Sequence, residues 1–335
     1  WTNDTNMSRI TLKTMMIMPA LLLQKPSFKS KAKEHTQCLQ RRLLNWENGQ
    51  FDVLMSECRT IQKSLKNSTH SLSSEYIAKT FAKHMLNGKI NSAIRLLDKC
   101  ESAGVLPLTT KVLDELKSKH PVASAPEPAV MITGDVPFID PAQFNNIDES
   151  AIARAAMKTR GAAGPSGADA DQWRRMLISK NYATVGKDLR TAITNAAKKL
   201  CIVDITKDDS LIIEAFTACR LIPLDKNGEG VRPIGVGEVL RRIIGKAIVY
   251  VIKPDILESA GSLQLCAGHA SGCEAAVHAM SEMYEEEATD ALLLVDASNA
   301  FNAMNRSVLL HNIKYICPPM ATYIRNCYYR PSRLF

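Results

Sequence analysis

The stretch LLLVDASNAFN, from Leu292 to Asn302, decides the expected fold of this chain. Five apolar residues, Ala291 to Val295, precede Asp296. A continuous apolar run of this length is typical of a β-strand that is buried on both faces. An ionised carboxylate at the end of such a strand is costly unless it is paired, and a divalent metal ion is one partner that stabilises it.

The same stretch permits a second interpretation. In many α/β proteins the Asp after a strand only closes a turn or caps a helix, and here Ser298 or Asn299 is suited to cap a helix that begins near Ala300. Under the metal interpretation, Phe301 would stand as an apolar wall beside the ion. Independent residues elsewhere in the chain have to decide between the two.

The segment RLIPLDKNGEGVRPIG, from Arg220 to Gly235, predicts a β-hairpin. Asn227-Gly228 is the strongest short-range hairpin signal, and Pro233 suits an edge strand or a bulge. The hairpin carries Lys226 at its tip and Arg232 just beyond. Arg forks onto phosphate oxygens and Lys acts as a point charge, so such a hairpin can fold over a triphosphate. The alternative is an ordinary solvated hairpin with surface cations.

Taken in order, these segments resemble the reverse transcriptases of non-LTR, LINE-like retrotransposons. TRGAAGPSGADADQWRRML (159–177) resembles the Gly-Pro-Ser-Gly-x-Asp turn that opens their fingers, and LQLCAGHASGCEAAVHAM (263–280) resembles the Gly-rich segment before their first catalytic motif. The resemblance covers about residues 152–335 and depends on the ordered set. It implies an α+β fold: the fingers and incomplete palm of a right-hand polymerase, preceded by a helical region.

The resemblance also implies an activity, RNA-directed DNA polymerisation, with an RNA template, a DNA primer and dNTPs as partners. Two Mg²⁺ ions, or Mn²⁺, would clamp the attacking 3′-hydroxyl and the leaving pyrophosphate. Asp296 matches the catalytic metal ligand, and Ala297 would offer its backbone carbonyl to the metal. Phe301 matches the position that excludes a ribose 2′-hydroxyl. Lys226 and Arg232 match the triphosphate contacts.

The sequence departs from the family in two places. Asn302 stands where many members have Asp, and the Tyr-x-Asp-Asp hairpin that supplies further catalytic carboxylate does not occur. Asp208-Asp209 follows Lys207 without a strand-turn-strand context and indicates a solvated loop. We therefore expect this polypeptide to be a truncated, catalytically incompetent piece of an enzyme. The alternatives are a noncatalytic nucleic-acid-binding or interaction protein derived from a retroelement remnant, and a helical adaptor unrelated to polymerases.

The positive charge lies in the amino-terminal part of the chain. Residues 1–120 hold 19 Lys and Arg against 10 Asp and Glu, whereas the remaining residues hold 23 against 24. A basic region suits binding to a phosphate backbone, although solvated helix faces are the commoner explanation. Arg241, Arg242 and Lys246, on a helix predicted over 239–251, face either nucleic acid or solvent.

Three parts are expected along the chain. Residues 1–120 form a basic helical region, in which helix pairs are split at Asn48-Gly49 and Asn87-Gly88. Residues 121–147 form a Pro-rich linker, and residues 148–335 form the truncated polymerase domain. In that domain, helices are predicted to begin after Asp148, after Asp169 or Asp171, and over 183–200.

The cysteines indicate a reducing, intracellular environment. The nine cysteines form no Cys-x2-Cys pair and leave one unpaired. Cys266, His269, Cys273 and His278 crowd together, but their spacing fits no common zinc module, and small buried thiols on a helix are the expected outcome. No segment reaches the roughly 18 apolar residues that span a bilayer, so no membrane association is expected. A nuclear location is an expectation from the family.

Overall fold

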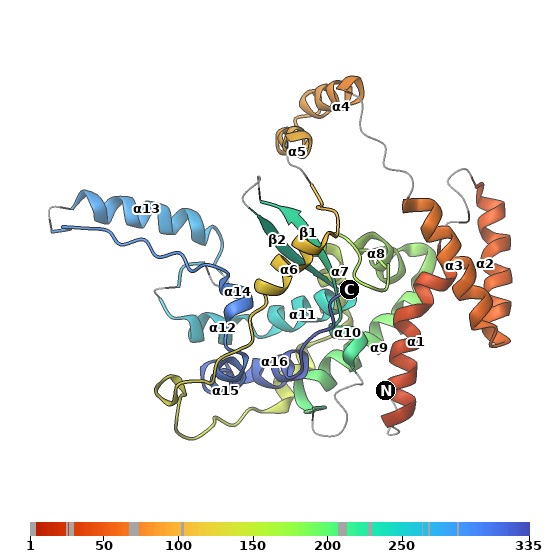
Figure 1. Ribbon diagram of the computed structural model, residues 1–335. Helices are drawn as coiled ribbons and strands as arrows, with labels where there is room; N and C mark the ends of the chain where they lie inside the picture. The colour runs from red at the N-terminus through yellow and green to blue at the C-terminus, as the bar shows by residue number, and fades with distance from the viewer. Residues whose placement is uncertain are drawn as a thin grey trace.

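Helices dominate the architecture. The computed structural model describes all residues except 1–4, 25, 27–29, 67–73, 102–103, 207–212, 227–229, 263, 267–268 and 287. Helices make up 64% of it, and the sheet found in the described part is one two-stranded antiparallel hairpin (Figure 1). The α+β class therefore holds only in a loose sense.

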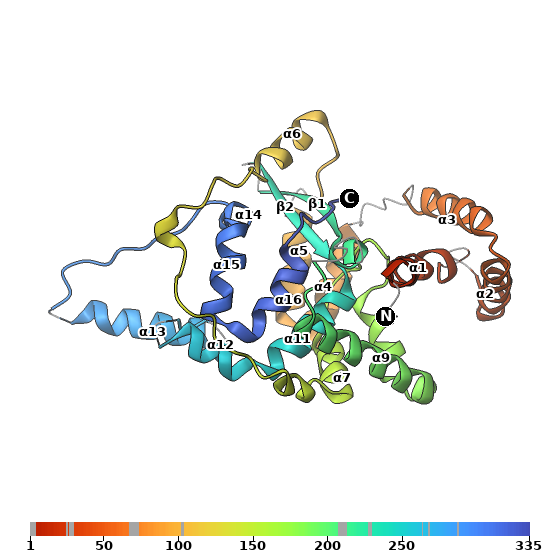
Figure 2. The same cartoon turned by 90° about the horizontal axis from the view of Figure 1, so that it is seen from below.

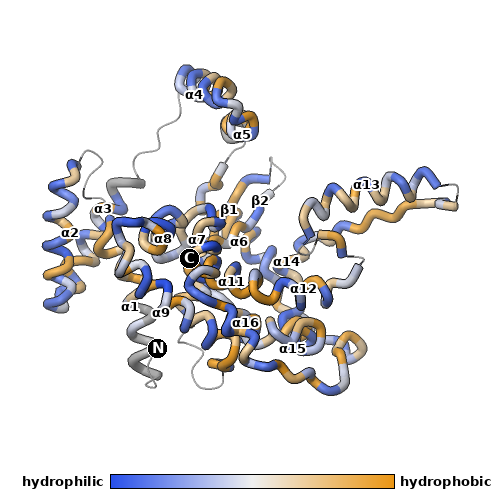
Figure 3. The backbone as a smooth tube through the Cα atoms, turned by 180° about the vertical axis from the view of Figure 1, so that it is seen from behind, coloured by the Kyte–Doolittle hydropathy of each residue, from blue (hydrophilic) through white to orange (hydrophobic). Residues whose placement is uncertain are grey.

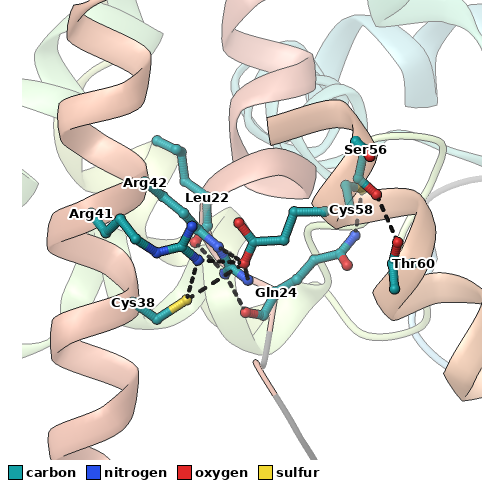
Figure 4. Close-up of polar contacts among 9 residues, drawn as sticks. Leu22, Gln24, Cys38, Arg41, Arg42, Ser56, Cys58 and Thr60 are labelled. Atoms are coloured by element: carbon teal, nitrogen blue, oxygen red, sulfur yellow. Dashed lines mark hydrogen bonds and ion pairs between the residues drawn. The ribbon is translucent and has the colours of Figure 1, made fainter. Parts of the chain in front are cut away.

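Three amino-terminal helices are joined by a buried arginine. They are α1 (Thr5–Leu22), α2 (Ala32–Glu47) and α3 (Phe51–Lys66), and the break between the last two falls at Asn48-Gly49, as predicted. The Arg42 side chain is 2% exposed and donates to the carbonyls of Leu22 (3.1 Å) and Gln24 (2.5 Å) and to the Glu57 carboxylate (2.7 Å) (Figure 4). Because a buried cation is tolerated only when its donors are paired, this cluster fixes how the three helices pack.

A second helix pair stands apart from the rest of the molecule. α4 (Ser74–Leu86) and α5 (Ile90–Glu101) pack on each other, with the predicted break at Asn87-Gly88 (Figure 1). Gly88 has φ +66°, a conformation that favours glycine and ends α4. These two breaks were predictable because the Asn-Gly signal is local.

The main hydrophobic core lies among five helices of the second half. They are α7 (Glu149–Lys158), α8 (Ala170–Ile178), α9 (Ala183–Ile202), α11 (Val239–Val251) and α16 (Pro318–Tyr328). Asp148 caps α7 by accepting from Ala151 N (2.7 Å), and Asp169 caps α8 by accepting from Gln172 N (2.8 Å). Both caps were predicted, and of the two candidates for α8 the N-cap is Asp169 and not Asp171.

The Pro-rich segment runs alongside the later helices as a strap (Figure 2). Between α6 (Thr110–Ser118) and α7 it forms only the 3-10 turns η1 (Pro128–Val130) and η2 (Pro141–Asn146). Asparagine amides of the later segment donate to its carbonyls: Asn299 to Lys119 (2.9 Å) and Asn305 to Ser124 (2.8 Å). These bonds hold in place the Pro-rich segment, whose composition predicts little helix.

The remaining elements surround the core. They are η3 (Lys180–Tyr182), α10 (Glu214–Thr217), α12 (Lys253–Ala260), α13 (Gly272–Glu285), α14 (Ala300–Ala303) and α15 (Arg306–Ile316). α13 and the extended chain that follows it project from the body as an arm, and the returning chain is strongly hydrophobic (Figures 1 and 3). No helix of the described chain has the length and apolar content needed to cross a membrane.

The prediction of a buried strand over Ala291–Val295 is wrong. These residues form extended chain without strand pairing, and Leu293, Leu294 and Val295 are 86%, 81% and 83% exposed. A strand requires a neighbour that takes its backbone N–H and C=O groups. The apolar pattern indicates side chains suited to burial, but it does not indicate which strand would pair with them. In the described part of the chain, no strand lies beside this segment.

Candidate nucleic-acid interface

The hairpin predicted from the Asn-Gly turn is present. β1 (Cys219–Asp225) pairs antiparallel with β2 (Val231–Gly237). Both are edge strands within the described part of the chain, so Pro233 lies on an edge strand, as predicted. Lys226 and Arg232 are exposed near the tip, where Lys226 N donates to Gly230 O (2.9 Å). The Asn227-Gly228 turn lies outside the described residues.

Neighbouring segments hold the hairpin in place. Leu106 N donates to Pro223 O (2.9 Å), and Leu221 N donates to Phe335 O (2.8 Å), so two separate segments line the outer edge of β1. On the other strand, Val231 N donates to the Glu115 carboxylate of α6 (2.6 Å). Sequence reasoning missed Glu115, because a single Glu on an amphipathic helix carries no signal that it reaches a hairpin.

The Gly-Pro-Ser-Gly turn packs against the junction between β2 and α11. Ser166 donates to the Glu238 carboxylate from its backbone N (2.7 Å) and its hydroxyl (2.6 Å), and both side chains are buried. A Cβ at Gly164 would lie 2.9 Å from the backbone of Glu238, so only glycine fits there. Two segments that sequence reasoning connected only through a resemblance are therefore in direct contact.

This buried carboxylate predicts a pH-dependent stability. Burial raises the pKa of Glu238, and the hydrogen bonds from Ser166 oppose that rise without overcoming it. A folded pKa above the unfolded value of about 4.3 gives stability that is present below that pH and lost as pH rises through the folded pKa. We expect the unfolding free energy of the parent, minus that of Glu238→Gln, to fall as pH is raised from 4 to 8, because only the parent has this ionisable carboxyl group. Urea denaturation at each pH measures it, and a difference that rises with pH would contradict this assignment.

A cationic face lies where α7 and α11 pack together. It consists of Lys158, Arg160, Arg242 and Lys246. Lys246 Nζ donates to Lys158 O (3.0 Å), and Arg242 Nη1 donates to Arg160 O (2.8 Å), so backbone contacts hold the four cations close together. None of the four forms a salt bridge within the described residues, and Arg242 Nε is buried without a hydrogen-bond partner.

The electrostatics of this face favour an anion. Burial lowers the pKa of Lys246, and Arg242, Arg160 and Lys158 lower it further. Cations grouped in this way are stabilised when a phosphate supplies further negative charge. Beside them, Arg154 lies over the Tyr250 ring, 4.2 Å from its centre, and donates to the Tyr250 hydroxyl (3.0 Å). Tyr250 is half exposed and extends the face along α11.

Only two of the three cations predicted on α11 share this face. Arg242 and Lys246 belong to it, one helical turn apart. Arg241 instead lies over the Tyr328 ring of α16, 5.0 Å from its centre. Sequence reasoning missed Lys158 and Arg160, because they come from a different segment and nothing in the helical period of α7 indicates their partner.

The predicted catalytic segment lies on the exposed arm. Asp296 and Ala297 are exposed in the extended chain, and Phe301 is 94% exposed on α14. α14 does begin at Ala300, but Asn299 makes no side-chain cap. Within the described part of the chain, no group of three or more His, Cys, Asp or Glu side chains is placed to hold a metal ion. A single carboxylate does not by itself fit a pair of Mg²⁺ ions, which require convergent oxygen ligands.

α6 connects the two motif segments. At one point it binds the hairpin through Glu115, and just after its end the Lys119 carbonyl accepts from Asn299 (2.9 Å), next to α14. The structure thus joins the segment that carries Lys226 and Arg232 to the segment that carries Asp296 through one short helix.

No family model, no curated protein and no solved structure matches this chain.

Proposed function

We propose that this chain is the fingers and part of the palm of a reverse transcriptase-type polymerase, and that the cationic face binds the phosphate backbone of an RNA template and DNA primer. The observation that carries the proposal is this face: four cations on α11, at the end of α7 and just after it, without salt bridges in the described residues. Such a face binds nucleic acid through counterion release, which does not depend on base sequence.

The hairpin supports the polymerase reading. Arg232 and Lys226 lie near the tip of the β1–β2 hairpin. Backbone hydrogen bonds from two other segments hold β1, and α6 holds β2. A rigid support of this kind places a guanidinium so that it meets a triphosphate with little loss of entropy. Under this proposal Asp296 supplies one metal ligand and Phe301 discriminates against ribose. The convergent partner carboxylates are not among the described residues, and we expect no primer extension by this chain alone.

A second candidate is a noncatalytic nucleic-acid-binding protein. The exposed, ungrouped position of Asp296 favours it, because nothing in the described part of the chain assembles a metal site around this residue. Both candidates use the cationic face, but only the polymerase needs the hairpin cations to bind a nucleotide triphosphate.

Nucleotide binding by Arg232→Gln separates the two candidates. Titration of the chain, bound to an RNA template with a DNA primer, with a fluorescent dNTP should give saturable binding that weakens by about 10- to 100-fold in Arg232→Gln, because a charge-assisted hydrogen bond contributes about 1.5–3 kcal/mol. Arg220→Gln is the matched control, since Arg220 is exposed on the same hairpin face at its other end. Equal binding by both variants, or no dNTP binding by a chain that binds nucleic acid, would favour the noncatalytic candidate.

A further inference from the structure

The loop before α13 brings two exposed thiols together. The Sγ atoms of Cys266 and Cys273 lie 3.6 Å apart. Both side chains are exposed and Cys266 lies outside α13, so the expectation of small buried thiols on a helix is wrong here. Cys58, Cys201, Cys317 and Cys327 are buried, and Cys38 and Cys219 are half-buried. Among the cysteines whose exposure is described, this pair is therefore the one that a reagent in solution reaches first.

The backbone sets the position of both cysteines. Ser271 adopts the left-handed conformation (φ +52°), which turns the chain sharply into α13. A Cβ at Gly272 would overlap the Leu265 carbonyl oxygen, so the absence of a side chain lets the start of α13 close onto the residue before Cys266. Cys273, in the first turn of α13, is thereby held next to Cys266.

The two thiols share a hydrogen bond. That contact, in which either sulfur can be the donor, is the main cause that raises the pKa of Cys266. Either cysteine can supply the thiolate that begins the reaction. The thiolate is the attacking species in thiol–disulfide exchange.

We propose that Cys266 and Cys273 are a redox-active dithiol site, which small disulfides of the glutathione class convert into an intramolecular disulfide. The thiolate of one cysteine attacks glutathione disulfide, breaks its S–S bond and expels one glutathione thiolate. The thiolate of the other cysteine then attacks the cysteine sulfur of this mixed disulfide and expels the second. The two cysteine protons end on the two glutathiones released, so the dithiol loses two electrons and glutathione disulfide gains them.

The second step requires only a small movement of the two sulfur atoms. The sulfur atoms need to approach from 3.6 Å to the disulfide bond length of about 2.05 Å. Exposed side chains cover such a distance by rotamer changes alone. The bond would tie the loop to the first turn of α13, at the root of the arm that carries Asp296. This inference does not depend on the proposed polymerase activity.

Peptide mapping tests the proposal. The reduced full chain is incubated with glutathione disulfide under anaerobic conditions, remaining thiols are alkylated, and the protease digest is analysed by mass spectrometry. We expect a cross-linked peptide joining Cys266 to Cys273 that retains no glutathione. Cys266→Ser should retain glutathione on Cys273, and Cys273→Ser should retain it on Cys266, because neither variant has the second thiol that expels it.

Cys38→Ser, which removes a half-buried thiol on α2, is the control and should behave like the parent. Glutathione retained separately on both cysteines of the parent, pairing of either with another cysteine, or no oxidation of the pair would overturn the proposal. Since both positions are exposed, the serine variants are expected to fold, and circular dichroism verifies it.

Discussion

Removal of three cations from the α7–α11 face is expected to weaken binding to an RNA template with a DNA primer by about 10²- to 10³-fold at 0.1 M salt. Each phosphate contact contributes a salt-dependence slope of about −0.9, which corresponds to roughly eightfold in affinity per contact at that salt. The variant is Lys158→Gln with Arg160→Gln and Lys246→Gln. All three side chains are exposed, so their loss leaves the core unchanged. Fluorescence anisotropy over a salt series measures both the affinity and the slope, which should become shallower by about 2 to 3.

A matched triple variant controls for net charge. Lys79→Gln, Lys83→Gln and Lys89→Gln remove three exposed cations from α4 and the turn that follows it, away from the cationic face. Long-range attraction to the whole molecule would make the two triple variants equally weak. A local binding face requires the α4 variant to stay within a few-fold of the parent, and equal losses would contradict it.

Asn326→Ala should cost about 3–5 kcal/mol of unfolding free energy, the largest single-residue effect expected on the core. Asn326 is 3% exposed on α16 and accepts from Ile205 N (3.0 Å). Its amide donates to the carbonyls of Leu200 (2.9 Å) and Val203 (2.8 Å), so one side chain pairs three backbone groups at the end of α9. Each buried group left unpaired costs about 1–3 kcal/mol.

Denaturation in urea measures this loss against Asn181→Ala, an exposed asparagine of η3 that should change stability by less than about 0.5 kcal/mol. A loss below about 1 kcal/mol for Asn326→Ala would show that water replaces the amide and that the end of α9 is not fixed by α16.

The features that could be predicted from sequence are those that depend on near neighbours. Asp148 and Asp169 cap helices through backbone groups only three residues away, and the bounds of α11 follow the apolar period of its own residues. The β1–β2 hairpin follows from a turn signal between two adjacent apolar runs. In each case, all the interacting groups lie in one short window.

The features that could not be predicted depend on distant partners. Burial of Ala291–Val295 requires a neighbouring strand, and an apolar run says nothing of whether one lies beside it. The Ser166–Glu238 contact joins residues far apart in the chain, and a buried Glu looks in sequence like any exposed one. The cationic face was half predicted for the same reason: the sequence of α11 shows Arg242 and Lys246, but the other two cations come from the end of α7 and the residues just after it.

The arm is acidic, whereas the α7–α11 face is cationic. Residues 272–301 hold seven Asp and Glu and no Lys or Arg. An acidic arm repels a phosphate backbone unless cations intervene, which agrees with the proposal that nucleic acid binds at the α7–α11 face. The arm carries Asp296, whose proposed role as a metal ligand requires further carboxylates around it.

Photocrosslinking tests the central claim most directly. An RNA template with 4-thiouridine, annealed to a DNA primer, is bound to the chain and irradiated, and the crosslinked peptides are identified by mass spectrometry. The cationic face predicts crosslinks in α7 and α11, centred on Lys158 and Lys246. Crosslinks confined to the amino-terminal helices α2 to α5 would contradict it and would place nucleic-acid binding in the basic region instead.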